Sequence, residues 1–137
     1  MSTPQPLQAL VRYWLEKSHL ALAAAERERA AGDLSLAMNR VYYACFYAVC
    51  AVLAAEGIAY GKHSAVRAAL HQHLVKPGRV DPAWGAFYNR AFDDRQEADY
   101  EAAPEFDDAT VTDRIARAAE FIGQLQRLVP LLDYSSS

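Results

Sequence analysis

The stretch DDRQEADYE, residues 93–101, concentrates charged side chains in an otherwise apolar, alanine-rich chain. Its candidate catalytic residues are Arg95, Asp99 and Tyr100. An arginine guanidinium can hold a phosphate group through two parallel hydrogen bonds. Asp99 lies one helical turn after Arg95, near enough to pair with it, and the ring of Tyr100 can cover the pair. Two interpretations stay open: a structural Arg95–Asp99 bridge in the core, or a cleft that binds an anion or catalyses a reaction.

A second group of polar side chains lies in the stretch NRVYYACFYAV, residues 39–49. Asn39 and Arg40 are neighbours, and Arg40 shares a helical face with Tyr43 and Tyr47. In one interpretation their polar ends are satisfied within the core or at its surface. In the other, Arg40 joins Arg95 in lining a cleft, and Asn39 and Arg40 bind the substrate.

The third group is a row of basic residues. His63, Arg67 and His71 recur every four residues and therefore share one helical face. Such a row is typical of a solvated face. If the helix flanks the cleft, however, His63 becomes a substrate-binding residue that can also transfer protons, because its ordinary pKa lies near neutrality. His71 and His73 are two residues apart, diverge on a helix and do not form a metal pair.

The composition excludes several classes of protein. The chain has 137 residues and a net charge of −3, which argues against coating nucleic acid through bulk charge. Cys45 and Cys50 point to different sides of one helix, so neither a local disulfide nor a metal site is expected. No glycine-rich phosphate loop or nucleophile signature indicates a cofactor, and none is expected. No apolar run approaches a membrane span and no signal peptide is present, so we expect a cytoplasmic protein without membrane contact.

Helices must position these groups, because strand signals are almost absent. Five helices are predicted by apolar spacing, by Gly32 and Gly57 as stops, and by Asp33, Asp81-Pro82 and Asp107 or Asp108 as starts. Their expected ranges are about residues 7–31, 34–56, 64–75, 82–103 and 108–129. The second is apolar on every side and should lie at the centre. We predict an all-α fold, a five-helix up-and-down antiparallel bundle, formed by a single domain over residues 1–137 with its core at about 7–130 and short flexible ends.

Three motifs, NRVYYACFYAV (39–49), GKHSAV (61–66) and RQEADYE (95–101), together resemble the HEPN family of small prokaryotic helical proteins. The resemblance spans about residues 7–130. It implies a five-helix bundle that usually forms homodimers. It also implies a toxin of a two-gene module whose antitoxin is a minimal nucleotidyltransferase, and in many members a metal-independent RNase. The family's catalytic signature is an Arg followed, four to six residues on, by a His at the dimer cleft.

Arg95 matches the arginine of that signature, but the matching stretch supplies Asp99, Tyr100 and Glu101 and no histidine. Asp99 and Tyr100 are poor proton-transfer groups near neutral pH, because their ordinary pKa values lie far from it. Three functions stay open: an endoribonuclease toxin with a degenerate Arg-His motif, in which Arg40 or His63 assists; a non-catalytic HEPN subunit that binds a nucleotidyltransferase, RNA or a nucleotide; and a helical interaction scaffold.

Overall fold

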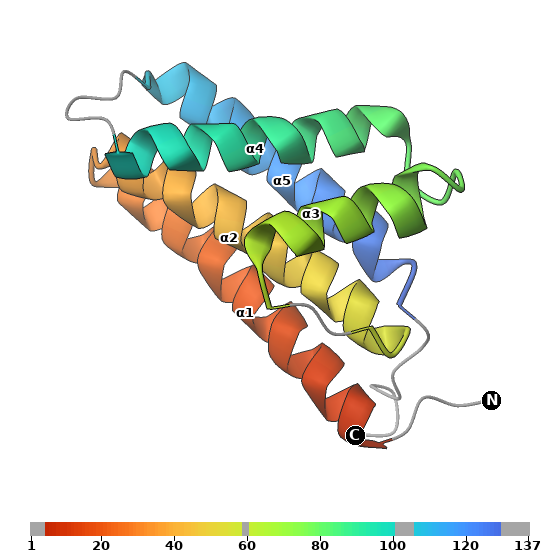
Figure 1. Ribbon diagram of the computed structural model, residues 1–137. Coiled ribbons are helices and arrows are strands. Elements are labelled where there is room, and N and C mark those ends of the chain that lie inside the picture. The colour runs from red at the N-terminus through yellow and green to blue at the C-terminus, as the bar shows by residue number, and fades with distance from the viewer. Residues whose placement is uncertain (1–4, 59–60, 101–105, 130–137) are drawn as a thin grey trace.

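The computed structural model describes the backbone of residues 5–58, 61–100 and 106–129, and the side chains of 6–58, 61–96 and 106–129. Within these ranges the chain is helical and contains no strand (Figure 1). The α-helices are α1 (Gln5–Ala30), α2 (Leu34–Ala55), α3 (His63–Leu70), α4 (Pro82–Tyr100) and α5 (Asp108–Gln126), and a short π-helical segment, η1 (His71–Val75), continues α3. The predicted all-α, five-helix bundle is confirmed.

Local capping explains where the helices begin and end. Gly32 adopts a φ of +87° after α1, a left-handed conformation that glycine reaches without strain. The Asp33 side chain then accepts a hydrogen bond of 3.0 Å from the backbone N–H of Leu36 and caps α2. Asp107 accepts a hydrogen bond of 2.7 Å from the N–H of Thr110 and caps α5 in the same way. The sequence signals for these boundaries are therefore confirmed.

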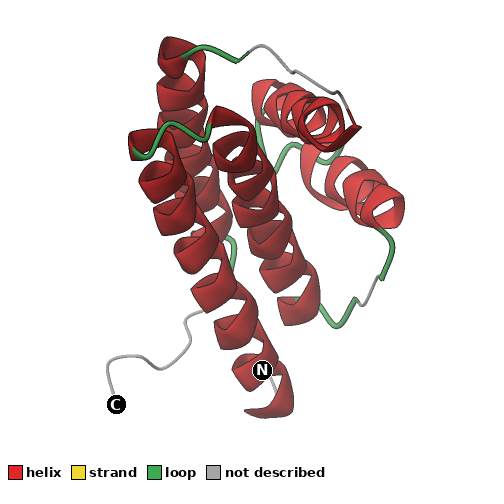
Figure 2. Cartoon of the chain, turned by 90° about the vertical axis from the view of Figure 1, so that its left-hand side faces the viewer, coloured by secondary structure: helices red, strands yellow, loops and turns green. Residues whose placement is uncertain are grey.

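The helix at the centre of the bundle is α2, which contacts α1, α3, α4 and α5. Figure 2 shows α3 and α4 almost end-on beside the other three helices, so they cross α2 obliquely. By length and composition alone α2 could cross a membrane, with a mean hydropathy of 1.4, yet 72% of its most apolar window is buried. The expectation that no apolar run approaches a membrane span is corrected for α2. Its burial is that of a core helix.

Small residues let α1 lie close against α2. Ala21 and Ala25 of α1 and Ala44 of α2 are buried in this contact. The buried Ser18 hydroxyl donates a hydrogen bond of 2.7 Å to the carbonyl oxygen of Ala44, so this polar group that α1 brings into the core is satisfied. Both cysteines of α2 are buried free thiols, and burial raises the pKa of each.

The third predicted helix extends to Val75 as expected, but its second half is π-helical. In this segment His71 faces α4: its Nε2 lies 3.1 Å from the Asn89 side-chain oxygen. Gly85 of α4 makes the close approach possible, since a Cβ built there would lie 2.8 Å from Cε1 of His71 and 3.1 Å from Cγ2 of Val75. The wider π-helical turn of η1 and the lack of a side chain at Gly85 together let α4 pack closely against η1.

Candidate functional site

The candidate site is built around Tyr42, which projects from the middle of α2. Its side chain is fully buried. Its hydroxyl oxygen lies 2.7 Å from Nδ1 of His63, a hydrogen-bond distance. Its ring also lies against Phe92 of α4, with centroids 5.6 Å apart and planes nearly perpendicular. Tyr42 therefore touches the two elements, α3 and α4, that carry the candidate functional groups.

His63 is the first residue of α3 and lies half-buried over α2. Its ring stacks on Phe46, with centroids 4.3 Å apart and an interplanar angle of 9°. The Tyr43 ring meets it edge-on at 5.6 Å. Partial burial, and next the positive charge of Arg95, lower the pKa of His63 below its ordinary 6.5. At neutral pH the imidazole is therefore largely uncharged and able to accept a proton.

Arg95 reaches the same cluster from α4. Its guanidinium carbon lies 5.1 Å from the Tyr42 ring centroid, 5.8 Å from that of Phe92 and 5.9 Å from that of Tyr43. These contacts hold a cation against aromatic faces. Arg67 of α3 also contacts this cluster, because its guanidinium carbon lies 4.3 Å from the Phe92 centroid. The structure thus brings Arg95, Arg67 and His63 together from two helices.

Asn39 and Arg40 lie on the adjoining face of α2. Nε and Nη2 of Arg40 donate to the side-chain oxygen of Asn39 at 3.1 and 2.8 Å. The Arg40 guanidinium carbon also lies 4.9 Å from the Tyr43 centroid, so Arg40 and Arg95 contact the same ring. Arg40 and Arg95 are therefore neighbours at Tyr43, while the cleft that they are predicted to line stays a prediction. The Asn39 amide orients the guanidinium of Arg40.

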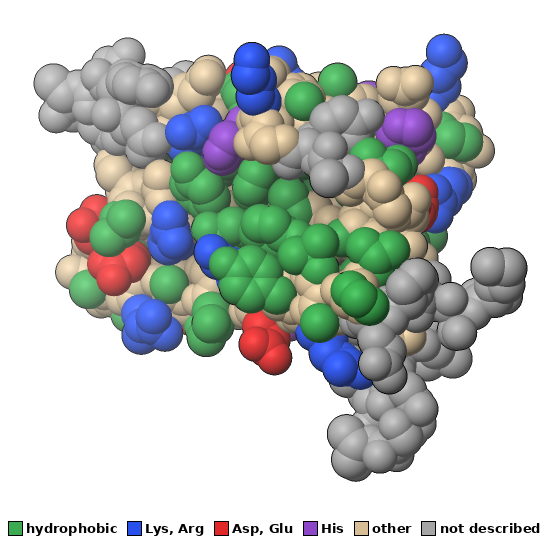
Figure 3. All heavy atoms as spheres, turned by 60° about the horizontal axis from the view of Figure 1, so that its bottom comes forward, with side chains coloured by type: hydrophobic (Ala, Val, Ile, Leu, Met, Phe, Trp, Pro, Cys, Tyr) green, Lys and Arg blue, Asp and Glu red, His purple; other side chains and the backbone are tan. Residues whose placement is uncertain are grey.

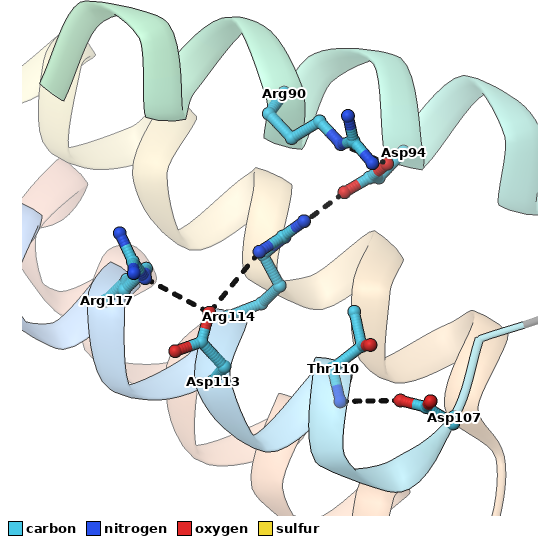
Figure 4. A network of polar contacts seen from close by, with 7 residues as sticks. All are labelled: Arg90, Asp94, Asp107, Thr110, Asp113, Arg114 and Arg117. Atoms are coloured by element: carbon cyan, nitrogen blue, oxygen red, sulfur yellow. Dashed lines mark hydrogen bonds and ion pairs between the residues drawn. The ribbon is translucent and has the colours of Figure 1, made fainter. Parts of the chain in front are cut away.

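The side chains of Asp99 and Tyr100 lie outside the described residues, so the predicted Arg95–Asp99 pair stays a prediction. The described acid that α4 buries is Asp94, which the sequence reasoning did not single out. Its carboxylate lies 3.3 Å from Nε of Arg90 and 3.3 Å from Nε of Arg114 in α5 (Figure 4). A structural bridge is therefore present in this acidic stretch, at Asp94.

Beside this network an open groove of about 510 Å³ lies between α4 and α5. Its lining includes Arg90, Arg114 and Arg117. Arg114 is shared between Asp94 and Asp113, and Arg117 also binds Asp113, as Figure 4 shows. Because each arginine already faces an acid, this groove offers little net charge to an anion. The stronger candidate for phosphate binding is the cluster at Tyr42.

Sequence reasoning did not single out Tyr42, and it described the row of His63, Arg67 and His71 as typical of a solvated face. All three members of that row, His63, Arg67 and His71, are half-buried against α2 or α4. A tyrosine in the middle of a buried helix was the available signal, because a buried phenol usually has a hydrogen-bond partner.

The chemistry open to this cluster is phosphate binding and proton transfer. Arg95 provides a fixed positive charge and His63 a neutral imidazole. Burial raises the pKa of Tyr42 to about 12, so its hydroxyl keeps its proton near neutral pH. Among the described side chains, no group of three or more His, Cys, Asp or Glu is placed to hold a metal ion.

Comparison with known proteins agrees with the motifs and the helical fold. The HEPN domain model matches residues 11–128. A protein of Thermotoga maritima named "UPF0332 protein" is 37% identical over 122 residues, which cover 89% of this chain and 92% of that protein. A protein of Methanocaldococcus jannaschii named "Putative toxin MJ0142" is 33% identical over 91 residues, 66% of this chain and 62% of that protein. The chain belongs to the HEPN domain family.

Proposed function

We propose that this HEPN protein is the toxin component of a two-gene module and acts as a metal-independent endoribonuclease, with Arg95 and His63 as its principal functional residues. Arg40 and Asn39 would bind the substrate beside them. The name of the Methanocaldococcus relative and the family resemblance support the toxin role. We further propose a minimal nucleotidyltransferase as antitoxin partner and the cytoplasm as the location.

One observation carries the proposal: the meeting of Arg95 and His63 at Tyr42. The family signature places its histidine shortly after the arginine on the same helix, and residues 96–101 contain none. In this chain His63, at the start of α3, lies beside Tyr42 instead. Arg95 and His63 both contact Tyr42, and the charge of Arg95 lowers the pKa of His63. Arg95 and His63 would together supply the arginine and the histidine of the signature from two different helices.

The reaction would use these groups as follows. His63 removes the proton of an RNA 2′-hydroxyl, whose oxygen forms a bond to the adjacent phosphorus while the bond from phosphorus to the 5′-oxygen breaks. The imidazolium then returns the proton to the leaving 5′-oxygen, so the enzyme is restored. Arg95, with Arg40 beside it, stabilises the negative charge that grows on the phosphate oxygens. The lowered pKa of His63 keeps it ready to act as the base.

We also propose that the protein works as a homodimer, formed through an apolar face of α1. Leu10, Tyr13 and Leu20, on one stripe of α1, are exposed to 39%, 49% and 69%. Lys17 lies in the same stripe, with its ammonium 4.8 Å from the Tyr47 centroid. Figure 3 shows hydrophobic side chains gathered on one face of the molecule, bordered by basic and acidic ones. Exposed apolar surface of this kind is typical of a protein–protein contact.

This face is continuous with the candidate site. Trp14 stacks on Tyr47 with centroids 5.7 Å apart, and Tyr47 lies 5.8 Å from Tyr43. Tyr43 in turn touches both His63 and Arg95. A second copy seated on α1 would therefore come close to the site, as expected for a composite cleft.

The test is cleavage of labelled single-stranded RNA in the presence of EDTA by the wild type and by Arg95→Ala and His63→Ala. We expect Arg95→Ala to lower the rate on the order of 100-fold or more and His63→Ala to lower it on the order of 100-fold. Arg90→Ala, which changes an arginine of the same helix that faces Asp94, should cleave normally. Expression of the wild type should arrest growth, and Arg95→Ala should relieve the arrest. Cleavage that persists unchanged in both site variants would place the active site elsewhere.

The absence of a histidine from residues 96–101 favours a second candidate, a non-catalytic HEPN subunit that binds a nucleotidyltransferase or a nucleotide through Arg95. In that case RNA stays intact with every variant. Arg95→Ala then weakens binding of the co-expressed partner, or of ATP measured by calorimetry, while the fold is retained. The two candidates therefore differ in the RNA assay.

A further inference from the structure

A hydrogen bond joins Tyr42, which is buried and held in place, to His63, whose ring must be oriented for the proposed reaction. Tyr42 is fully buried in the middle of the central helix and is held by the rings of Phe92 and Tyr88, with centroid distances of 5.6 and 5.9 Å. His63 is half-buried at the first position of α3, directly after residues that form no helix. Without its aromatic and hydroxyl contacts, the imidazole would be free to rotate about its side-chain bonds.

The geometry of the ring decides which nitrogen serves the site. Nδ1 of His63 lies 2.7 Å from the buried Tyr42 hydroxyl, so it faces the core. The two nitrogens of an imidazole point away from one another, and stacking on Phe46 at 4.3 Å fixes the ring plane. Nε2 is therefore directed away from the core. The hydrogen bond that Nδ1 makes also determines which nitrogen of the neutral ring carries the proton.

The charge states of the neighbouring groups favour one direction of this hydrogen bond. Besides Tyr42, the titratable or charged groups that face His63 within the described chain are Tyr43 of α2 and Arg95 of α4. Neither is a carboxylate, so the imidazolium that forms when His63 takes a proton depends on the Tyr42 oxygen for a partner. A hydrogen bond from a charged donor is roughly twice as strong as a neutral one. The hydrogen bond that the Tyr42 oxygen accepts therefore becomes stronger when His63 becomes charged.

We propose that Tyr42 is a positioning residue for His63: its hydroxyl oxygen accepts the Nδ1–H of the imidazole and leaves Nε2 as the nitrogen that exchanges protons with the substrate. The inference rests on the proposed function, in which His63 transfers protons. In the resting state Nδ1 carries the hydrogen and Nε2 has the lone pair. After Nε2 has taken the 2′-hydroxyl proton, both nitrogens carry hydrogen, and the Tyr42 oxygen stabilises the charged ring.

The first test reads the tautomer directly and needs no RNA. In wild-type protein labelled with ¹⁵N at histidine, NMR at a pH where His63 is neutral should show the hydrogen on Nδ1. Tyr42→Phe removes only the hydroxyl; it should move the hydrogen to Nε2 and shift the His63 titration to lower pH, because the imidazolium loses its acceptor. Tyr43→Phe is the matched control, since it removes the neighbouring hydroxyl from another ring that touches His63. It should leave both tautomer and titration unchanged. Hydrogen on Nε2 in the wild type overturns the proposal.

The second test uses labelled single-stranded RNA and separates this inference from the proposed function. Tyr42→Phe should lower kcat on the order of 100-fold, leave KM within about twofold because the substrate contacts remain, and move the acid limb of the pH–rate profile to lower pH. If Arg95→Ala and His63→Ala abolish cleavage while Tyr42→Phe keeps the wild-type kcat and profile, the positioning role is wrong and the proposed function stands. If the wild type does not cleave RNA, the proposed function fails, and the tautomer alone decides the role of Tyr42 toward His63.

Discussion

The Asp94 carboxylate of α4 and the Arg114 guanidinium of α5 lie 3.3 Å apart, with 7% and 18% of their side chains exposed. Arg90, one turn earlier on α4, approaches the same carboxylate from the solvent side. A carboxylate buried this deeply depends on its cationic partners. Asp94 therefore fixes α4 against α5, while the next residue, Arg95, faces α2 and α3. The bridge sets the rotation of α4 that presents Arg95 to the candidate site.

Asp94→Asn should lower the free energy of unfolding by about 1–3 kcal/mol, because Arg114 keeps only its contact with exposed Asp113 and hydrogen bonds to charged groups are lost. Urea denaturation followed by circular dichroism measures the change. Asp93→Asn makes the same substitution at the exposed neighbouring position and should stay within about 0.5 kcal/mol of the wild type. Equal effects of the two substitutions would show that the bridge contributes nothing to stability.

Gly85→Ala should destabilise the protein, because the new methyl group would overlap the His71 ring and crowd Val75. Overpacking of this kind costs about 1–3 kcal/mol, which offsets the gain of about 1 kcal/mol from the higher helix propensity of alanine. Gly123→Ala in α5 is the control, since a Cβ there has no neighbour within 4 Å. Thermal melting should show Gly85→Ala below the wild type and Gly123→Ala at or above it. A Gly85→Ala protein as stable as Gly123→Ala would mean that the contact between η1 and α4 is loose.

Much of the fold was predictable from local signals. The stops at Gly32 and Gly57 and the caps at Asp33 and Asp107 are properties of short segments, and each is confirmed. The apolar positions of the fifth predicted helix (108–129) are also buried or half-buried as helical spacing predicts, although α5 itself ends at Gln126. These are Val111, Ile115, Ala118, Ile122, Leu125 and Val129. Such signals are reliable because they depend on the backbone within one or two turns.

The site was less predictable, because it depends on how helices cross. The sequence singled out Arg95, Arg40 and His63 and left open whether they share a cleft, because only the oblique path of α3 over α2 brings His63 to Arg95 at Tyr42. The bridge at Asp94 was missed for a similar reason. Which acid of a dense acidic stretch is buried depends on the rotation of α4 against α5, and residue spacing within α4 does not contain that information.

Because the pKa of His63 is lowered in the folded protein, the free energy of unfolding should decrease as the pH is lowered. Since the folded pKa lies below the unfolded one, the unfolded chain binds the proton more tightly. The folded state is therefore favoured fully above the unfolded pKa, and this contribution is lost as the pH falls from near 6.5 through the folded pKa. His63→Gln should give a flatter decline of melting temperature between about pH 8 and pH 5. Identical slopes for the two proteins would show that His63 is solvated in the folded state.

Substitution on the exposed stripe of α1 should test the homodimer. Leu20 is 69% exposed, so Leu20→Glu should change the stability of a single subunit by no more than about 0.5 kcal/mol. In a dimer seated on this face the same change buries a carboxylate without a partner, which is strongly unfavourable. Light scattering of the eluted peak at micromolar concentration should give a dimer for the wild type and a monomer for Leu20→Glu. Ala119→Glu, which adds the same charge to an exposed position of α5, should remain dimeric. A wild-type monomer would remove the composite cleft, and a dimer in which Leu20→Glu has no effect would place the contact on another face.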